Sequence, residues 1–260
     1  MIGAARTLLA SHNLVTEWTV RTLRARYQQS LLGWLWAVVQ PATQAVILAV
    51  IFTWVVPVDT GPTPYLMFSF VATAPWTFLS GALTDMTNSL VENMNLVNKV
   101  YFPREALPAA TMLARLVDFA VALGFIFVLA LYFQLPTLSL ALAALPAIAL
   151  VQMMLTAGLG LAGAALNVFV RDVRSVLALG LQLWFYATPV LYPIDKVPAA
   201  LRPYFDVNPM TGIVEAYRAV LLRAEWPDQS FLVSAAVSAL VLIIGYGLFK
   251  RVEFRFADVV

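Results

Sequence analysis

Cysteine is absent from this chain of 260 residues, and histidine occurs once, as His12. Without cysteine the chain has no disulfide, no thiolate metal site and no cysteine nucleophile. A single histidine leaves too little for a histidine-based zinc site or a Ser-His-Asp triad. We therefore expect no catalytic residue, no metal site and no cofactor-binding site in this chain, and we do not expect it to be an enzyme.

Charged residues are also scarce. They make up 12% of the chain, hydrophobic residues make up 62%, and the mean hydropathy is +0.84. Soluble domains carry about a quarter charged residues, so this composition is typical of a membrane protein. In such a protein the net charge of +2 matters less than the places where the charges lie.

A nucleotide-binding P-loop is missing as well. Such a loop needs a Gly-Lys pair, because the glycine turn cradles phosphate and the lysine reaches the β and γ phosphates. The three lysines, Lys99, Lys196 and Lys250, follow Asn, Asp and Phe. If ATP drives this protein, the ATP must be bound by another chain.

Long uncharged runs dominate what is present. A membrane-spanning helix needs about 20 apolar residues, and the runs predict an all-α polytopic membrane protein with six transmembrane helices. We see no internal repeat, so residues 1–260 form one transmembrane domain. The expected spans cover residues 31–58, 65–90, 107–133, 138–170, 175–191 and 231–249.

Lysine and arginine are concentrated in the connections on one side of these spans. Basic residues favour the cytoplasmic side, which places both termini and the loop at 93–106 in the cytoplasm. The outer connections hold only Lys196, Arg202, Arg218 and Arg223. The inner ones hold Arg6, Arg21, Arg24, Arg26, Lys99, Arg104, Arg171, Arg174, Lys250, Arg251 and Arg255.

Residues 11–30 form an amphipathic pattern ahead of the first span. Trp18 and Tyr27 belong to its apolar side, and Arg24 and Arg26 add positive charge. Basic residues and a Trp beside an apolar stripe indicate a helix that lies in the membrane interface. A simple cytoplasmic lead-in is the alternative.

The cytoplasmic loop at 93–106 is bulkier than a turn between two spans requires. It combines polar and basic residues with an aromatic pair, which suits a short amphipathic helix that docks onto another protein. The residues that we expect to make this contact are Asn95, Asn98, Lys99, Tyr101, Phe102, Pro103 and Arg104.

The outer connection at 193–229 is too long for a turn and too polar to span. Two helical pieces are expected in it, at 198–205 and 211–222. The dipeptide Asn208-Pro209 separates them, because a residue before proline is pushed out of the helical conformation.

Two acidic residues, Asp85 and Asp118, lie within the expected spans. Asp118 follows Arg115 by three residues, so the two share a helix face, and we expect them to form a mutually compensated ion pair. A proton relay is the less favoured alternative. At the end of the fourth span, Arg171 and Asp172 either anchor the helix at the cytoplasmic face or clamp a neighbouring loop or partner.

Aromatic residues are abundant at membrane depth. Most are expected in lipid-facing belts or in packing, but an aromatic face also stacks on a sugar ring. The best candidates for lining such a path cluster near Pro75 and Pro189. They are Trp76, Phe78, Trp184, Phe185 and Tyr186.

Five segments together resemble a known family. They are RARYQQSLLGWLWAVVQP at 24–41, LVNKVYFPREALP at 96–108, NVFVRDV at 167–173, TPVLYPIDKVP at 188–198 and NPMTGIVEAYRAVLL at 208–222. Each is weak alone, but their order along nearly the full chain resembles the permease subunit of type-2 ABC exporters for polysaccharides such as O-antigen or teichoic acid.

The resemblance implies a homodimer with two copies of a separate ATPase subunit, which binds ATP and Mg²⁺. The loop at 93–106 would be the coupling helix. The helix at 11–30 would lie at the cytoplasmic interface with the membrane lipid and would also contact the ATPase. An undecaprenyl-linked polysaccharide would cross the bacterial plasma (inner) membrane through a channel at the dimer interface. No nucleic acid is expected as a partner. The region at 193–229 would form re-entrant external gate helices with Tyr192, Pro193, Asn208, Pro209, Tyr217 and Arg218.

Three alternatives remain. A type-2 ABC permease could carry a small lipid or drug instead. A membrane-embedded polyprenyl-phosphate sugar transferase would need acidic clusters for Mg²⁺, whereas the cytoplasmic loops offer isolated acids. A secondary transporter is disfavoured by the lack of an inverted repeat.

Overall fold

The computed structural model describes residues 12–28, 30–99, 102–136 and 139–258, without the side chains of residues 98, 257 and 258, and all regular structure in these ranges is helical. The elements follow one another as α2 (His12–Tyr27), η1 (Gly33–Leu35), α3 (Trp36–Val50), η2 (Ile51–Val55), α4 (Tyr65–Glu92), α5 (Met94–Lys99), α6 (Ala106–Tyr132), η3 (Leu140–Ala144), α7 (Leu145–Phe169), α8 (Val173–Tyr186), η4 (Ile194–Lys196), α9 (Arg202–Val207), α10 (Pro209–Arg218), η5 (Ala219–Arg223), α11 (Gln229–Val252) and η6 (Glu253–Asp258).

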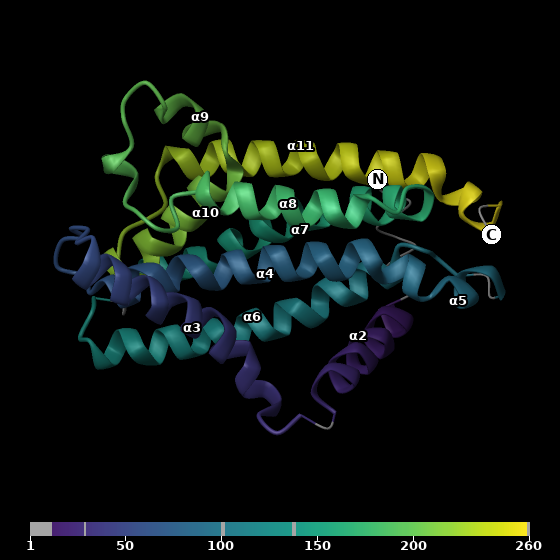
Figure 1. Cartoon of the computed structure of the whole chain (residues 1–260), viewed down its shortest axis with the longest axis horizontal. Coiled ribbons are helices and arrows are strands. Elements are labelled where there is room, and N and C mark those ends of the chain that lie inside the picture. Colours follow the sequence, from purple (N-terminus) through teal and green to yellow (C-terminus); the bar gives the residue numbers. More distant parts are fainter. Residues whose placement is uncertain (1–11, 29, 100–101, 137–138, 259–260) are drawn as a thin grey trace.

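Five helical segments are long and apolar enough to cross a membrane. They cover Gly33–Val55, Tyr65–Glu92, Ala106–Tyr132, Leu140–Phe169 and Gln229–Phe256. In Figure 1, α4, α6, α7 and α11 run along the long axis of the molecule, as expected for spans that share one membrane. These five agree with five of the six predicted spans to within a few residues, except that the last extends to Phe256.

The predicted span at 175–191 is the exception. Its helix, α8, covers Val173–Tyr186 and has 14 residues. At 1.5 Å per residue it is roughly 21 Å long, less than the roughly 30 Å of a bilayer core. The helix ends at Tyr186 because Pro189 follows closely and cannot continue the backbone hydrogen bonding. The sixth span therefore remains a prediction.

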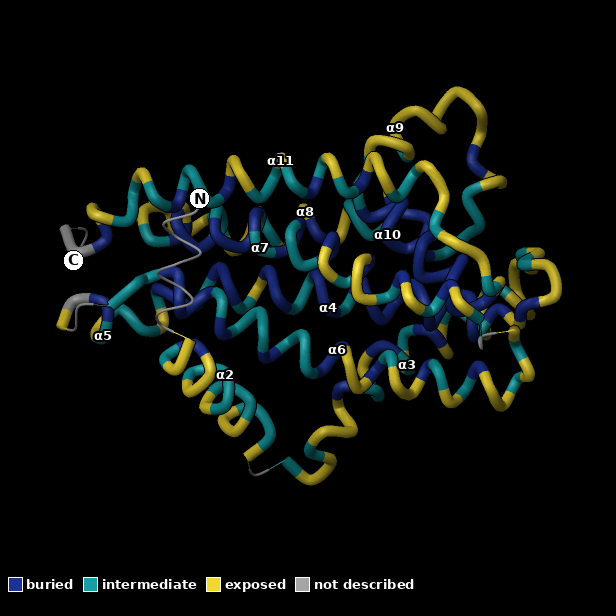
Figure 2. Tube along the Cα trace, turned by 180° about the vertical axis from the view of Figure 1, so that it is seen from behind, coloured by how far each residue is buried: buried dark blue, intermediate teal, exposed yellow. Residues whose placement is uncertain are grey.

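The central element is α4. In its most apolar stretch 78% of the residues are buried, compared with 17–39% in the other four spans. Figure 2 shows α4 mostly buried, with α3 and α11 exposing one side each. Its Pro75 lies inside the helix, and the Pro75 carbonyl accepts a hydrogen bond of 2.8 Å from Gln152 Nε2 of α7. The polar group on the neighbouring helix thus ties α7 to the centre of the bundle.

The closest helix contact joins α7 and α11 at two glycines. A Cβ atom on Gly245 would lie 1.9 Å from the Gly158 carbonyl oxygen. Only a residue without a side chain allows backbones to approach in this way, which is how small residues promote helix association in membranes. The contact fixes α11 against the bundle at about two thirds of its length.

The region at 193–229 folds back against the end of the bundle opposite α5 (Figure 1). It contains α9 and α10, with the break at Asn208 as the sequence predicts. The Asn208 side chain caps α10 by accepting a 3.1 Å hydrogen bond from the Met210 amide. The observed helix bounds are Arg202–Val207 and Pro209–Arg218, followed by a π-helical turn at Ala219–Arg223, instead of the expected 198–205 and 211–222.

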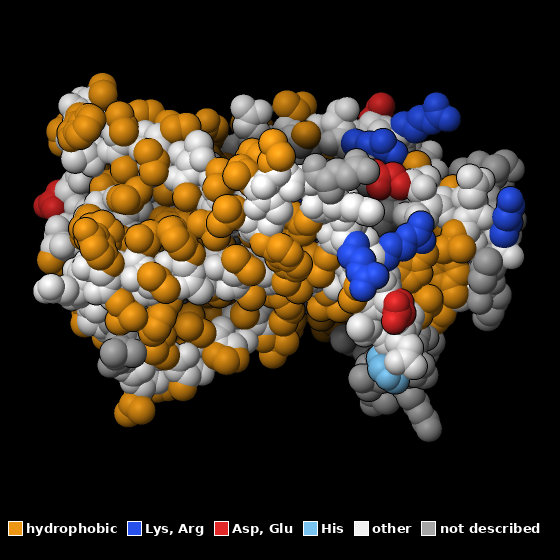
Figure 3. All heavy atoms as spheres, turned by 90° about the horizontal axis from the view of Figure 1, so that it is seen from below, with side chains coloured by type: hydrophobic (Ala, Val, Ile, Leu, Met, Phe, Trp, Pro, Cys, Tyr) orange, Lys and Arg blue, Asp and Glu red, His pale blue; other side chains and the backbone are white. Residues whose placement is uncertain are grey.

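Charged side chains gather at the opposite end. Figure 3 shows most of the visible Lys and Arg residues toward the end that holds α2 and α5, whereas the rest of this face is largely hydrophobic. This distribution agrees with the basic-residue bias on which the predicted orientation rests. There α2 inclines away from the long helices and packs on α6 through Val15, Ala106 and Ala110.

Candidate functional site

A cluster of charged side chains joins α2 to α4 and α6 inside the helical bundle. Arg26 Nη2 lies 2.8 Å from Asp85 Oδ2, and Arg26 Nη1 pairs with Asp118 Oδ2. Arg115 Nε lies 2.6 Å from Asp85 Oδ2. The Tyr27 hydroxyl donates a 2.6 Å hydrogen bond to Asp118 Oδ1. Four charges and one hydroxyl from three helices therefore form a single network.

The predicted ion pair between Arg115 and Asp118 is wrong. Arg115 binds Asp85 of α4, and Asp118 binds Arg26 of α2. The spacing within α6 places the two side chains on one face, but each has a geometrically better partner on a neighbouring helix. Asp85 thus bridges two arginines, and Arg26 bridges two aspartates.

Tyr27 is fixed in its protonated state by this arrangement. Burial and, to a smaller degree, the hydrogen bond to Asp118 raise the pKa of the Tyr27 hydroxyl from 10.0 to about 12. A protonated hydroxyl is required here because the carboxylate can only accept a hydrogen bond. The Tyr27 ring is also stacked on Trp34, with 4.9 Å between ring centroids.

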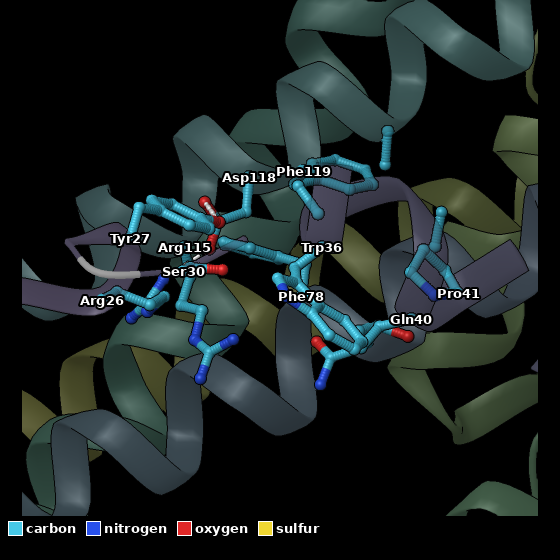
Figure 4. A pocket seen from close by; sticks show the side chains of 14 residues that line it. Arg26, Tyr27, Ser30, Trp36, Gln40, Pro41, Phe78, Arg115, Asp118 and Phe119 are labelled. Carbon is cyan, nitrogen blue, oxygen red and sulfur yellow. Dashed lines mark hydrogen bonds and ion pairs between the residues drawn. The ribbon is translucent and has the colours of Figure 1, made fainter. Parts of the chain in front are cut away.

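A cavity of about 300 Å³ lies beside the network, between α2, α3, α4 and α6. Figure 4 shows Arg26, Tyr27 and Arg115 toward one end of this cavity and Gln40, Pro41 and Phe78 toward the other. Trp36 lies between these groups in the same view. The lining therefore combines charged groups, an amide and aromatic rings.

The cavity opens onto the surface of α3. Trp36 and Gln40 are exposed, and both also line a second groove of about 370 Å³ that continues along α3 past Thr43 and Gln44 to Ile47. These residues recur at helical spacing and occupy one helix face. Gln40, Thr43 and Gln44 are uncharged polar side chains on an otherwise apolar helix. Such groups are costly in an apolar environment unless they are hydrogen-bonded, so this face is suited to contact with something other than lipid.

The predicted path-lining aromatic residues lie mostly inside the chain. Trp76 is 6% exposed and makes edge contacts with Trp184 and Phe185 at 5.8 and 5.4 Å between ring centroids. Phe78 is buried, stacks on Phe119 and lines the cavity, whereas Tyr186 is 58% exposed. The sequence reasoning did not select Trp36 and Gln40, although their i, i+4 spacing in an uncharged span was a usable signal.

The loop at 93–106 contains a helix, but a shorter one than the sequence suggests. Helix α5 ends at Lys99, so Phe102, Pro103 and Arg104 lie beyond it. Asn95 and Lys99 are exposed. Tyr101 and the side chain of Asn98 lie outside the described residues, and the predicted role of these residues in docking stays a prediction.

Arg104 is turned toward the chain's own C-terminal segment. It donates a hydrogen bond to the Glu253 carbonyl, and its Cζ lies 5.7 Å from the centroid of the Phe256 ring. Lys250 Nζ bridges the buried Glu105 carboxylate and Glu253, at 2.9 Å from each. The segment that follows α5 is thereby fastened to the end of α11.

At the end of the bundle opposite α5, Arg218 is fully buried. Its Nη1 donates to the Pro189 carbonyl at 2.6 Å and to Glu215 Oε1 at 2.8 Å, and its Nη2 donates to the Val190 carbonyl at 3.0 Å. The guanidinium carbon lies 3.5 Å from the centroid of the Phe68 ring. Although the sequence assigns Arg218 to a polar outer connection, the structure places it in the core.

The other predicted gate residues bond to neighbouring helices. Tyr217 is buried, and its hydroxyl donates to Gln152 Oε1 at 3.0 Å. Asn208 Oδ1 accepts a 2.9 Å hydrogen bond from Trp184 Nε1, and Pro209 begins α10. Tyr192, which precedes the half-buried Pro193, donates from its hydroxyl to the Tyr186 carbonyl at 3.0 Å. The region is thus bonded to α7 and to the end of α8.

The remaining predicted residues are more exposed. Arg171 and Asp172 are exposed between α7 and α8, so the choice between an anchor and a clamp stays open. On α2, Arg24 is exposed and Trp18 is half-buried, with the Arg21 guanidinium 4.5 Å from the Trp18 ring centroid. Their proposed contact with the membrane interface remains a prediction.

The chain was compared with known proteins. The family model of the ABC-2 type transporter matches residues 14–222. The O-antigen export system permease protein RfbA of Myxococcus xanthus is 31% identical over 262 residues, covering 99% of both chains. A protein of the same name from Klebsiella pneumoniae is 28% identical, covering 95% of both chains. The polysialic acid transport protein KpsM of Escherichia coli is 23% identical, covering 90% of this chain and 91% of KpsM.

Proposed function

Because the chain belongs to the ABC-2 type transporter family, we propose that it is the permease of an ATP-driven exporter that moves a lipid-linked polysaccharide out of the bacterial cytoplasm. The polysaccharide is of the O-antigen or polysialic acid type. The carrier is a polyprenyl lipid of the undecaprenyl kind, and the protein resides in the plasma (inner) membrane with both termini in the cytoplasm.

The observation that carries this proposal is similarity over the whole length. The relatives are named for O-antigen export and polysialic acid transport, and the alignments cover at least nine tenths of each chain. The five long apolar helices support the same function, because a protein that moves a polymer across a membrane must itself span that membrane.

The energy source is a second chain. The lysines of this chain do not follow glycine, so a separate ATPase subunit binds ATP and Mg²⁺. Its docking site is the exposed cytoplasmic surface of α5, where Asn95 and Lys99 face outward. One ATPase copy binds each permease copy.

The permease works as a homodimer. Helix α8 buries only Leu181, and Leu183 is 72% exposed, so one chain leaves this helix largely uncovered. The face of α3 that carries Gln40 and Thr43 is uncovered as well. A second copy placed against these helices would enclose a path between the two chains, which separates the polar groups from lipid.

The contacts of Arg104 supply a route from the docking site to the outer end. Movement of the loop that follows α5 pulls on Glu253, and through it on α11. The outer part of α11 packs on α10, where a Cβ atom on Gly212 would lie 2.5 Å from the Ser230 carbonyl oxygen. A contact this close transmits displacement because protein interiors are close-packed.

Export itself is the test. The chain is purified with its candidate ATPase subunit and reconstituted in vesicles, and the ATP-dependent transfer of lipid-linked polysaccharide across the membrane is measured. The control is the same complex with the P-loop lysine of the ATPase replaced. We expect transfer only with the intact ATPase. Transfer of a small lipid or drug but not of the polysaccharide would contradict the proposal, as would sugar-transferase activity.

The docking site has a matched pair of variants. Lys99→Glu reverses a charge on exposed α5, and Lys196→Glu reverses an exposed charge at the opposite end of the chain. We expect Lys99→Glu to reduce copurification of the ATPase and Lys196→Glu to leave it unchanged. Equal recovery of the ATPase with both variants would contradict docking at α5.

A further inference from the structure

We propose that the cavity between α2, α3, α4 and α6 binds one uncharged sugar unit of the exported polymer. This inference rests on the proposed function for the origin of the ligand. The cavity itself is defined by side chains from all four helices, and the charged network of Arg26, Asp85, Arg115 and Asp118 ties three of these helices, α2, α4 and α6, to one another.

The cavity lies within the depth of the membrane. Asp85 precedes the cytoplasmic end of α4 at Glu92 by seven residues, or roughly 10 Å. Phe78 precedes the same end by fourteen residues, or roughly 21 Å. The network therefore lies near the cytoplasmic border, and the cavity beside it reaches toward the middle of a bilayer at Phe78. Ionisable residues at such depth are costly, and they characteristically mark the path of a substrate.

The two positive and two negative charges of the network cancel, and this neutrality favours an uncharged ligand. Arg26 and Arg115 are both paired with Asp85 or Asp118, so the cluster has no surplus positive charge. A phosphate or pyrophosphate group would bring uncompensated negative charge into a region of low dielectric. A sugar hydroxyl donates one hydrogen bond and accepts others, so it can bind the Asp118 carboxylate and the guanidinium groups of Arg26 and Arg115, which line the cavity, without adding charge.

The other lining groups fit the same ligand. Trp36, Phe78 and Phe119 present aromatic surface, on which the apolar face of a sugar ring can pack. Gln40 and Thr77 add an amide and a hydroxyl within the same cavity. This mixture of aromatic surface and polar groups is not needed for packing alone, because a packed core favours apolar side chains.

The size and opening of the cavity set how much of the polymer it holds. Its volume of about 300 Å³ lies at the lower limit of sites for small molecules, which suits one ring and not an oligosaccharide. Trp36 and Gln40 stand at the opening and are shared with the groove that passes Thr43 and Gln44. The next units of the polymer would lie along this face of α3, where uncharged polar side chains stand beside apolar ones.

Binding is tested on the complete chain with its partner ATPase in lipid nanodiscs. Saturation-transfer NMR is recorded with the methyl glycosides of mannose, galactose, rhamnose and N-acetylglucosamine, and with added inorganic pyrophosphate as the charged competitor. The variants are Gln40→Ala and Trp36→Leu. Val46→Ala is the matched control, because Val46 is 49% exposed on the same helix and lies outside the cavity.

We expect at least one glycoside to bind and the dissociation constant to rise about three- to tenfold in Gln40→Ala, as for the loss of one hydrogen bond. Trp36→Leu should weaken binding at least as much, and Val46→Ala should not change it. Pyrophosphate should not displace the glycoside. The proposal is overturned if no glycoside binds, if the Gln40 and Trp36 variants bind like the wild type, or if pyrophosphate competes.

This result is separable from the proposed function. Export of the polysaccharide by the wild-type complex together with unchanged glycoside binding in the variants would refute the sugar site alone. Specific glycoside binding without polysaccharide export would instead contradict the proposed transport reaction.

Discussion

Replacement of Arg218 by Met tests how the outer region is held. The side chain is 0% exposed and touches two parts of the chain that are distant in sequence, as well as Glu215 on its own helix. It pairs with Glu215 at 2.8 Å, donates to the Pro189 carbonyl at 2.6 Å and to the Val190 carbonyl at 3.0 Å, and covers the Phe68 ring. Methionine has a comparable length but no donor, so the substitution removes these bonds with little loss of volume.

The expected loss of stability follows from the groups left behind. The Glu215 side chain is 13% exposed, so its carboxylate would remain in a poorly hydrated place without its best partner. Breaking such a buried pair costs about 3–5 kcal/mol. The two carbonyls each lose a donor as well, at about 1–3 kcal/mol per unsatisfied group. These costs overlap, and we expect the free energy of unfolding to fall by about 4 kcal/mol.

The assay is equilibrium unfolding of the purified protein in detergent micelles, carried out as a double-mutant cycle with Glu215→Gln. The double variant should recover part of the loss, because it removes the unpaired charge. Arg223→Met is the control, because this side chain is 44% exposed and its ion pairs contribute at most about 1 kcal/mol. A loss below about 1 kcal/mol for Arg218→Met, or equal losses for both arginines, would refute the argument.

Three further substitutions probe other parts of the structure. Tyr27→Phe should lower the free energy of unfolding by about 1–3 kcal/mol. In the folded protein the pKa of the Tyr27 hydroxyl is raised from 10.0 to about 12. Its contribution to the free energy of unfolding should therefore be complete below pH 10 and be lost as the pH rises to about 12. If Tyr27→Phe and the wild type lose stability in the same way at alkaline pH, this expectation is contradicted. Gly245→Val should prevent stable folding, measured by monodisperse yield, whereas Gly247→Ala should be tolerated because nothing lies within 4 Å of a Cβ there. Arg104→Ala should increase hydrogen exchange in the last turn of α11, and Arg251→Ala, an exposed neighbour, should not.

Helix positions were the most predictable part of the fold. Five spans follow directly from uncharged runs, because a run of about 20 apolar residues has few alternatives to a helix in lipid. The break at Asn208 was equally predictable, because the following proline disfavours the helical conformation of the residue before it. The short α8 was not, because its apolar run continues past the point where Pro189 stops the helix.

The site was less predictable, because partners come from distant segments. The sequence identifies Arg115 and Asp118 as intramembrane charges but pairs them within one helix. Only the packing of α2 against α4 and α6 brings Arg26 between Asp85 and Asp118. In the same way, the aromatic content indicates sugar contacts, whereas burial decides that Trp36 is available at a surface and that Trp76 is not.

By itself the sequence determined that this chain is a membrane protein built from long apolar helices, that it carries no P-loop, and that it resembles polysaccharide permeases. These properties depend on the composition and on the order of residues within short segments, and both can be read directly from hydropathy and motifs. Only the tertiary structure decided which charges neutralise one another, that Arg218 is a core residue, and that a balanced network borders a cavity open to α3. Those features depend on which side chains meet across helices, and helix packing is not encoded in any single segment.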